Sequence, residues 1–371
     1  MHIFISIIKW AIIIFIILSI GVYLFLHFHP VFGGSPDEQS LTRIHQSKAF
    51  DGQQFNNIEP TVKLTSDEDG SLLKWIGSYF TPPKGKNPNQ PLPTLMLEPS
   101  TLINNDFVWF GHSTVLFKTE NKIFITDPVF YNASPVPFTG NAFNMTHKPT
   151  IDELPQIDAV LISHDHYDHL DYKAIQKLDK KTELFVAPLG VKGHLQHWGI
   201  ENQKIVELDW DEHIHIDNVT LTFVPARHFS GRRLNQDNPT LWGGYVVKSP
   251  DLSLYFSADS GYGTHYAERI KKYGPFDFAM IENGAYDKDW ASIHEFPEQT
   301  LQAINDIGVH KILPIHWGKF DLANHSWKEP IERLLEIVKP YNDISLATPK
   351  IGQVFNIKKP LPNELWWRQV N

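Results

Sequence analysis

The segment LISHDHYDHLD, residues 161–171, carries the most specific pattern in this chain. It contains H-x-H-x-D-H, formed by His164, His166, Asp168 and His169. The apolar run DAVLIS, which leads into the pattern, predicts a buried strand. Residues two apart on extended backbone project to the same side, so His164 and His166 can share one metal ion. The pattern therefore favours metal ligands over solvated surface histidines.

Asp168 and His169 follow where the chain is expected to turn into a helix. Adjacent residues point in different directions there, which allows a second metal ion beside the first. Four ligands cannot complete two coordination spheres, so further ligands are expected at nearby strand ends. Three candidates follow apolar runs: His228 after LTFVPA, Asp259 after LSLYFSA and His316 after KILPI. Each alone also fits a turn former or a cap, but together they favour a dinuclear site.

The composition narrows the classes of function. Of the 371 residues, 42% are hydrophobic and 20% charged, which is typical of a folded chain. The charge sum is 33 Lys+Arg minus 42 Asp+Glu, or -9, so a nucleic-acid partner is not expected. With 0 Cys, the chain has no disulfide, thiolate ligand or cysteine nucleophile, so any metal site must use carboxylates and some of the 19 His.

Residues 10–26 read WAIIIFIILSIGVYLFL, an apolar run just long enough to cross a membrane. The run exceeds a usual signal-peptide core, and no small-x-small cleavage site follows it, so we expect an uncleaved single-pass anchor rather than a signal peptide. Lys9 precedes the run, and the next basic residues lie farther away. By the positive-inside rule the catalytic domain is then extracytoplasmic, in the periplasm.

The rest of the chain divides into segments by composition and hydrophobic pattern. We expect an anchor over residues 1–32, an irregular Pro- and Gly-rich extension over 33–100 that packs on the main domain, and the main domain over 101–371. Residues 72–80 are expected to form a short helix. Strands are expected at residues 107–119, 123–126, 159–163, 184–187, 220–224, 244–247, 252–257 and 311–315, and helices at 172–178, 297–307 and 331–338. This alternation predicts an α/β fold with two mixed sheets and helices outside.

Several motifs together resemble the metallo-β-lactamase fold superfamily, and more closely its N-acylphosphatidylethanolamine-hydrolysing phospholipase D family with bacterial relatives. They are FVWFGHSTVLF, ITDPVF, IDAVLISHDHYDHLD, PARHFSGR, SADSGYG, GAYD and PIHWGKFDLANH, within residues 55–345. The resemblance implies an αββα sandwich and two zinc ions. It assigns one ion to His164, His166 and His228, the other to Asp168, His169 and His316, and makes Asp259 the bridge.

The candidate catalytic residues are Asp168, Asp127 and His294. Asp127, in ITDP at a strand end, matches a family position associated with activity; we expect it to orient a ligand imidazole, although turn capping also fits. His294 lies in SIHEFPEQ, and no spacing argument makes it a ligand. The resemblance places His294 at the edge of the site, where it binds phosphate or shuttles a proton; a structural role is the alternative.

Other histidines are not expected to bind metal. His194 and His197 have helix-like spacing, and His213 and His215 form a second H-x-H without a following D-H. His27 and His29 flank the membrane segment at headgroup level. His112, in FGHST, is expected to be a buried, hydrogen-bonded histidine.

The resemblance implies a zinc-dependent phospholipase D-type hydrolase that releases phosphatidic acid and an N-acylethanolamine. A phospholipid substrate and a membrane are the expected partners, and a homodimer is compatible with the family. His and carboxylate ligands also accept iron or manganese. Two alternatives stay open: a metal-dependent lactonase or esterase acting on a small phosphorylated substrate, and a non-catalytic zinc-binding scaffold.

Overall fold

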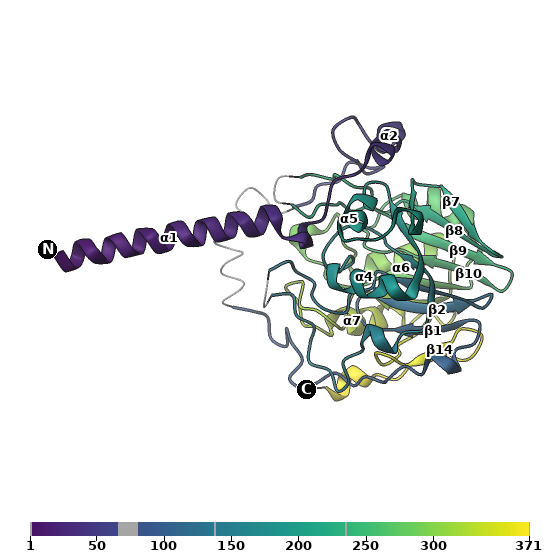
Figure 1. The fold of residues 1–371 in the computed structure, drawn as a ribbon. Coiled ribbons are helices and arrows are strands. Elements are labelled where there is room, and N and C mark those ends of the chain that lie inside the picture. Colours follow the sequence, from purple (N-terminus) through teal and green to yellow (C-terminus); the bar gives the residue numbers. More distant parts are fainter. Residues whose placement is uncertain (1, 66–80, 137–138, 234–235, 371) are drawn as a thin grey trace.

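The computed structural model describes residues 2–65, 81–136, 139–233 and 236–370. Helix α1 (His2–Phe28) projects from the body as a single long helix (Figure 1). Residues 3–28 of it are long and apolar enough to cross a membrane, and none of the most apolar window is buried against the body. The predicted anchor run 10–26 thus lies in one helix, which extends beyond it at both ends. The helix expected at residues 72–80 lies outside the described residues.

Two seven-stranded sheets form the body. The first has the order β14-β1-β2-β3-β4-β5-β6: β14 (Val354–Asn356), β1 (Asp106–Trp109), β2 (Val115–Thr119), β3 (Lys122–Thr126), β4 (Ile157–Leu161), β5 (Thr182–Pro188) and β6 (Ile205–Leu208). The second has the order β13-β12-β11-β10-β9-β8-β7: β13 (Ser345–Leu346), β12 (Lys311–Ile315), β11 (Phe278–Glu282), β10 (Leu252–Phe256), β9 (Gly244–Ser249), β8 (Val219–Val224) and β7 (His213–Ile216).

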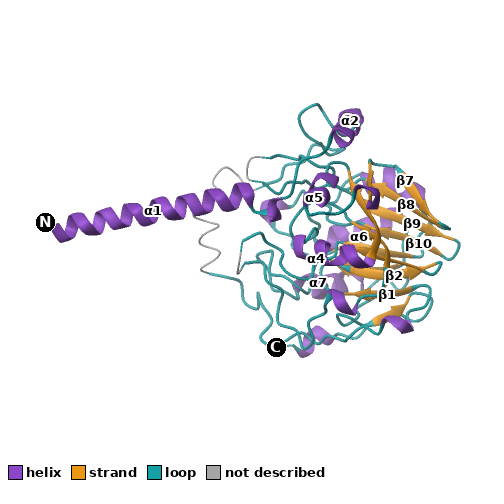
Figure 2. Ribbon diagram, viewed as in Figure 1, coloured by secondary structure: helices purple, strands orange, loops and turns teal. Residues whose placement is uncertain are grey.

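The helices are α2 (Glu38–Gln46), α4 (Tyr172–Leu178), α5 (Lys192–His197), α6 (Pro297–Ile307) and α7 (Glu329–Val338). Short 3₁₀ turns join many elements, at Pro30–Phe32, Pro99–Thr101, Ile151–Glu153, Asp179–Lys181, Asn202–Lys204, Lys271–Tyr273, Lys288–Trp290 and Trp366–Gln369, and Tyr266–Ile270 forms a π-helical turn. The strands lie on the side of the body away from α1, and many of the loops lie on the side from which α1 projects (Figure 2).

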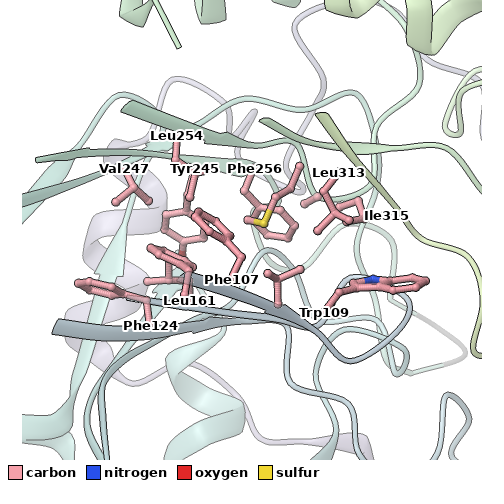
Figure 3. Close-up of a cluster of buried hydrophobic side chains, with 14 of the residues drawn as sticks. Phe107, Trp109, Phe124, Leu161, Tyr245, Val247, Leu254, Phe256, Leu313 and Ile315 are labelled. Atoms are coloured by element: carbon pink, nitrogen blue, oxygen red, sulfur yellow. The ribbon is translucent and has the colours of Figure 1, made fainter. Parts of the chain in front are cut away.

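Side chains alternate between the two faces of each strand, and this alternation separates the core between the sheets from the layers outside them. Phe107 and Trp109 of β1 point into the core between the two sheets, whereas Val108 faces the opposite side. Between the sheets, side chains such as Phe107 and Leu161 face Tyr245 and other residues of the second sheet (Figure 3). Helices α4 and α5 cover the outer face of the first sheet, and α6 and α7 cover that of the second. The predicted αββα sandwich is therefore confirmed.

Two details of the strand prediction were wrong. Residues 107–119 form β1 and β2, not one strand, because the chain reverses at Gly111 and His112, whose φ angles are 83° and 57°. Positive φ suits glycine and breaks an extended run. The prediction also omitted four strands: β6, β11, β13 and β14.

Candidate metal centre

The strands that deliver the candidate ligands end at the same edge of the molecule. In the first sheet, β3 and β4 are parallel, and they lead to Asp127 and His164. In the second sheet, β10, β11 and β12 are parallel. Strand β8 is antiparallel to β9, which is antiparallel to β10, so β8 runs in the same direction as β10. The carboxyl ends of β8, β10 and β12 therefore bring His228, Asp259 and His316 to one edge.

Three imidazoles form the first group. His164, His166 and His228 each offer a nitrogen within 4.8 Å of the others. Nε2 of His164 lies 2.9 Å, and Nε2 of His228 3.2 Å, from Nδ1 of His166. The other nitrogen of His164 contacts Ser163 Oγ at 2.9 Å, and that of His228 contacts the Ile293 carbonyl at 3.0 Å. These contacts turn the remaining ring nitrogens toward a common centre, as in histidine metal sites.

The second group combines imidazoles with carboxylates: His112, Asp168, His169 and His316. Oδ2 of Asp168 lies 3.4 Å from Nε2 of His169 and 3.5 Å from Nε2 of His316. The Asp168 carboxylate also lies 3.0 Å from Nε2 of His112.

Asp259 lies between the two groups. Its Oδ2 is 3.0 Å from His169 Nε2, 2.9 Å from His316 Nε2 and 3.8 Å from His228 Nε2. Asp259 also forms a possible metal-binding group with His164 and His169. A carboxylate in this position can contact two ions at once.

The buried polar atoms fit a pair of cations. Among the described residues, Oδ1 of Asp259 is buried without a hydrogen-bond partner, and the buried Nε2 atoms of His169 and His316 face Oδ2 of Asp259 without a well-aligned hydrogen bond. Unpaired polar atoms are costly inside a protein, and a cation held among them would remove that cost. Imidazole and carboxylate donors without thiolate accept zinc, iron or manganese. The donor set thus fits the divalent metals that this fold implies.

The electrostatics agree with this fit. Burial holds the pKa of His164 and of His228 well below its usual value, so both rings are neutral, which is the form that binds metal. Burial also acts to lower the pKa of His316, but the carboxylates of Asp259 and Asp168 outweigh it and raise that pKa to about 10. The same two carboxylates hold the pKa of His169 well above its usual value against burial. Positive charge is thus favoured among the carboxylates.

Asp127 lies behind the cluster. It follows β3 and is fully buried. Its Oδ1 accepts a hydrogen bond from the Ser163 N–H at 2.8 Å, and its Oδ2 accepts one from the Ser163 hydroxyl at 2.6 Å. The same Oδ2 lies 2.8 Å from Nδ1 of His169. This arrangement fixes the His169 ring with its Nε2 toward the cluster, as expected of a residue that orients a ligand.

His294 lies at the border of both groups. Its ring stacks on that of His316, with centroids 5.1 Å apart, and meets the ring of His228 edge-on, also at 5.1 Å. Its Nδ1 pairs with Oε1 of Glu282, which leaves Nε2 for another partner. His294 also belongs to a possible metal-binding group with His228 and Asp259.

Sequence reasoning missed Glu282. It is the last residue of β11, is fully buried, and accepts a hydrogen bond from the Ser260 N–H besides contacting His294. The available signal was the acidic residue that ends the apolar run FAMIE, at a strand end parallel to those of Asp259 and His316. Burial and the nearby Asp259 hold the pKa of Glu282 well above its usual value.

The remaining histidines fall outside the cluster or at its margin. His213 and His215 lie on β7 with exposed side chains, and neither belongs to a metal-binding group among the described residues. His194 is buried against Asp165 and also belongs to none of these groups in the described ranges, and His197 is exposed. His112 is buried and contacts Asp168, as expected, but it also contributes to the second group.

Comparison with known proteins agrees with the geometry. The model of the beta-lactamase superfamily domain matches residues 123–317, which include all seven predicted ligands. The chain belongs to the metallo-β-lactamase superfamily. Among solved structures of this superfamily fold, an isothiocyanate hydrolase from Delia radicum gut bacteria aligns with a TM-score of 0.52 and 19% identity, covering 67% of this chain and 98% of that one. At that identity the likeness concerns the fold alone.

Within the superfamily, the chain is similar to two kinds of relative. An uncharacterised Mycobacterium tuberculosis protein is 36% identical over 92% of this chain and 93% of its own length. N-acyl-phosphatidylethanolamine-hydrolyzing phospholipase D 1 of Caenorhabditis elegans is 32% identical over 67% of this chain and 74% of its own length. These relatives confirm the predicted family and support a metal-dependent hydrolase.

Proposed function

We propose that this protein is a membrane-anchored, dinuclear zinc phosphodiesterase of the phospholipase D type. Its substrate is an N-acylphosphatidylethanolamine-like phospholipid, and its products are phosphatidic acid and an N-acylethanolamine. The observation that carries the proposal is the buried cluster of histidines and aspartates at one strand edge. The identity to the Caenorhabditis elegans phospholipase supports the choice of substrate.

In this proposal, seven residues hold the two ions. His164, His166 and His228 would hold one, Asp168, His169 and His316 would hold the other, and Asp259 lies where its carboxylate could serve both. A pair of zinc ions held there would supply Lewis-acid stabilisation of charge on the phosphoryl oxygens. Iron or manganese would supply the same chemistry through the same donors.

The chain's own residues position these donors and move protons. Asp127 and Ser163 hold the rings of His169 and His164. In hydrolysis the oxygen of a water molecule bonds to phosphorus and gives up a proton, the bond between phosphorus and the ethanolamine oxygen breaks, and that oxygen must gain a proton as it leaves. We assign this proton transfer to Nε2 of His294: the raised pKa of Glu282 keeps its carboxyl group protonated, so that it donates to Nδ1 and the proton of the neutral ring lies on Nε2, from which it passes to the leaving oxygen.

The apolar helix α1 supports a location in the membrane. In the proposed organisation, residues 1–32 form a single-pass anchor, residues 33–100 an extension on the main domain, and residues 101–371 the hydrolase domain, which faces the periplasm. Because the chain has 0 Cys, one exposed cysteine introduced as Lys180→Cys reports the side of the membrane. We expect a membrane-impermeant maleimide to label it in intact cells; labelling only after lysis would reverse the assignment.

The deciding experiment measures metal content and hydrolysis together. Full-length protein in detergent micelles is assayed by elemental analysis and with three substrates: an N-acylphosphatidylethanolamine, a water-soluble phosphodiester and a phosphorylated sugar lactone. We expect about two zinc ions per chain, cleavage of the N-acylated lipid, and loss of both properties in His166→Ala. The matched control is His213→Ala, an exposed histidine of the second H-x-H on β7.

The alternatives predict other results. Turnover of the lactone without dependence on lipid or detergent would replace the phospholipase assignment by the lactonase or esterase. Zinc bound at full stoichiometry without turnover of any substrate would support a non-catalytic scaffold. A homodimer is tested on the same sample by its mass in solution.

A further inference from the structure

The segment that follows α1 is tied to the body through its backbone. Four consecutive carbonyls accept hydrogen bonds from side chains of the body, namely those of Pro30, Val31, Phe32 and Gly33. The donors are the Trp198 indole for the first, Arg232 for the second and Arg233 for the last two. The helix end is therefore docked on the body and not joined to it by a free linker.

Close backbone packing holds the same segment. Gly33 has a φ of 73°, and a Cβ there would lie 2.1 Å from Nδ1 of His194. A Cβ on the next residue, Gly34, would lie 2.5 Å from the carbonyl oxygen of Gly193. Real side chains do not approach so closely, so the segment fits against α5 only with glycine at both positions.

Arg232 reaches from this segment to the metal-binding loop. Its Nε and Nη2 donate to the Val31 carbonyl at 3.1 and 2.9 Å. Its Nη1 donates to the carbonyls of Asp165 and Leu170 at 2.6 and 2.9 Å. Those two residues bracket the loop that carries three of the four ligands of the pattern, namely His166, Asp168 and His169. One buried guanidinium thus joins the end of α1 to both ends of that loop.

Further contacts brace the Arg232 side chain and the loop. The guanidinium carbon lies 4.2 Å from the centre of the Tyr167 ring, and Tyr167 belongs to the loop. The Tyr167 ring meets the Phe32 ring edge-on at 6.4 Å. Asp165 Oδ1 accepts a hydrogen bond from the Gly231 N–H at 2.8 Å, and its Oδ2 lies 3.3 Å from Nε2 of His194, the ring that packs on Gly33. The loop therefore contacts the docked segment by two routes.

We propose that Arg232 is a positioning residue that couples the docked end of the membrane helix to the metal-binding loop and so holds the loop in its ligand geometry. The inference rests on the proposed metal-dependent function. In the part of the chain that the structure describes, Arg232 makes no hydrogen bond to a proposed ligand side chain; it acts through the backbone carbonyls of residues 165 and 170.

The neighbouring Arg233 provides a matched control. It donates to the carbonyls of Phe32 and Gly33, as Arg232 does to that of Val31. Unlike Arg232, it is exposed, and none of its hydrogen bonds reaches the loop in the part of the chain that the structure describes. Loss of Arg233 weakens the docking alone, whereas loss of Arg232 breaks the connection to the loop.

The test compares Arg232→Gln with Arg233→Gln in the full-length protein, reconstituted in lipid nanodiscs. Zn²⁺ affinity is measured by competition with a chromophoric chelator, and ligand geometry by the visible absorption of the Co²⁺-substituted protein. We expect Arg232→Gln to bind Zn²⁺ about 10- to 100-fold more weakly and to change the Co²⁺ spectrum, the usual cost of losing a residue that orients ligands. We expect Arg233→Gln to keep the wild-type spectrum and an affinity within about twofold of wild type. Equal effects of the two substitutions, or no effect of Arg232→Gln, would overturn the proposal.

Circular dichroism without metal shows whether Arg232→Gln folds. If it does not fold, two further variants test the proposal. Arg232→Lys keeps the charge but cannot span the three carbonyls, and Gly33→Ala pushes on His194 from the anchor side. Both should weaken Zn²⁺ binding, and wild-type affinity in both would refute the coupling. If the wild-type protein binds no metal, the proposed function fails; if it binds and hydrolyses but the variants match it, only this inference fails.

Discussion

Nδ1 of His169 lies 2.8 Å from Oδ2 of Asp127, and both side chains are fully buried. A carboxylate accepts at that position, so when the His169 ring loses a proton to bind a cation, the remaining proton stays on Nδ1 and the Nε2 lone pair faces the metal-binding cluster. Asp127 thus selects the tautomer that can bind a cation.

Asp127→Asn should reverse this selection. An amide NH₂ facing His169 favours the tautomer with the proton on Nε2, where it opposes a cation. We expect metal affinity to fall about 10- to 100-fold with the fold retained. The measurement is metal content after dialysis against graded chelator. Asp158→Asn is the control, since Asp158 lies on β4 in the same sheet and pairs with Lys122. Full metal retention by Asp127→Asn would contradict the assigned role.

The pair of Glu282 and His294 should act as one unit in turnover. With Glu282→Gln, the ring of His294 loses the carboxyl group that pairs with its Nδ1. We expect kcat to fall about 100-fold in Glu282→Gln and in His294→Gln, with metal content unchanged. Because the two residues serve one proton transfer, the double variant should be no slower than the slower single variant. Additive losses would show that they act separately.

The membrane location can be tested within α1. Ile16 lies near the middle of the helix and is exposed. A lysine there costs about 3 kcal/mol for insertion at the bilayer centre. We expect Ile16→Lys to move protein from the membrane pellet to the supernatant after an alkaline carbonate wash. Leu41→Lys, at an exposed apolar position on α2, should stay in the pellet. Equal retention of both variants would count against a spanning helix.

Lys319 makes stability depend on pH. Burial lowers its pKa to about 7, whereas an unfolded lysine has a pKa of about 10.4. Between these values the unfolded chain binds a proton that the folded chain does not, so the free energy of unfolding rises with pH, by about 1.4 kcal/mol per unit at most. We expect the urea midpoint of the wild type to rise between pH 7 and 9 relative to that of Lys319→Met.

The control for this pH effect is Lys173→Met, an exposed lysine on α4. It should follow the wild-type pH dependence. Parallel pH profiles for Lys319→Met and wild type would mean that Lys319 stays protonated in the folded protein, with its charge held by the carbonyls of Phe110 and Val129.

Local pattern explains which parts of the site were predictable. The spacing of His164 and His166 is a property of three consecutive residues, so it is visible without a fold. His228, Asp259 and His316 were found because each follows an apolar run and because strands of one direction end at one edge. Glu282 was missed with its strand, since the five buried residues of β11 lack the polar alternation that marks a half-buried strand.

Long-range pairing explains what was not predictable. Strand β14 pairs with β1, although most of the chain separates the two strands in sequence. The three residues of β14 are too few to show the alternating pattern of a strand. The reversal between β1 and β2 depends on two residues with positive φ inside an apolar run. Arg232 contacts Val31, which lies 201 positions earlier in the sequence, and also the metal-binding loop. These contacts exist only once both sheets have formed.

The docking of residues 30–33 constrains how the enzyme would meet its substrate. With α1 inserted in a bilayer, a rigid joint keeps the catalytic edge at constant height above one leaflet. Encounter with a lipid then depends on lateral diffusion in two dimensions and not on repeated adsorption from solution. Under the proposed function, hydrolysis would be confined to the leaflet from which the body emerges, and the phosphatidic acid formed would accumulate on that side alone.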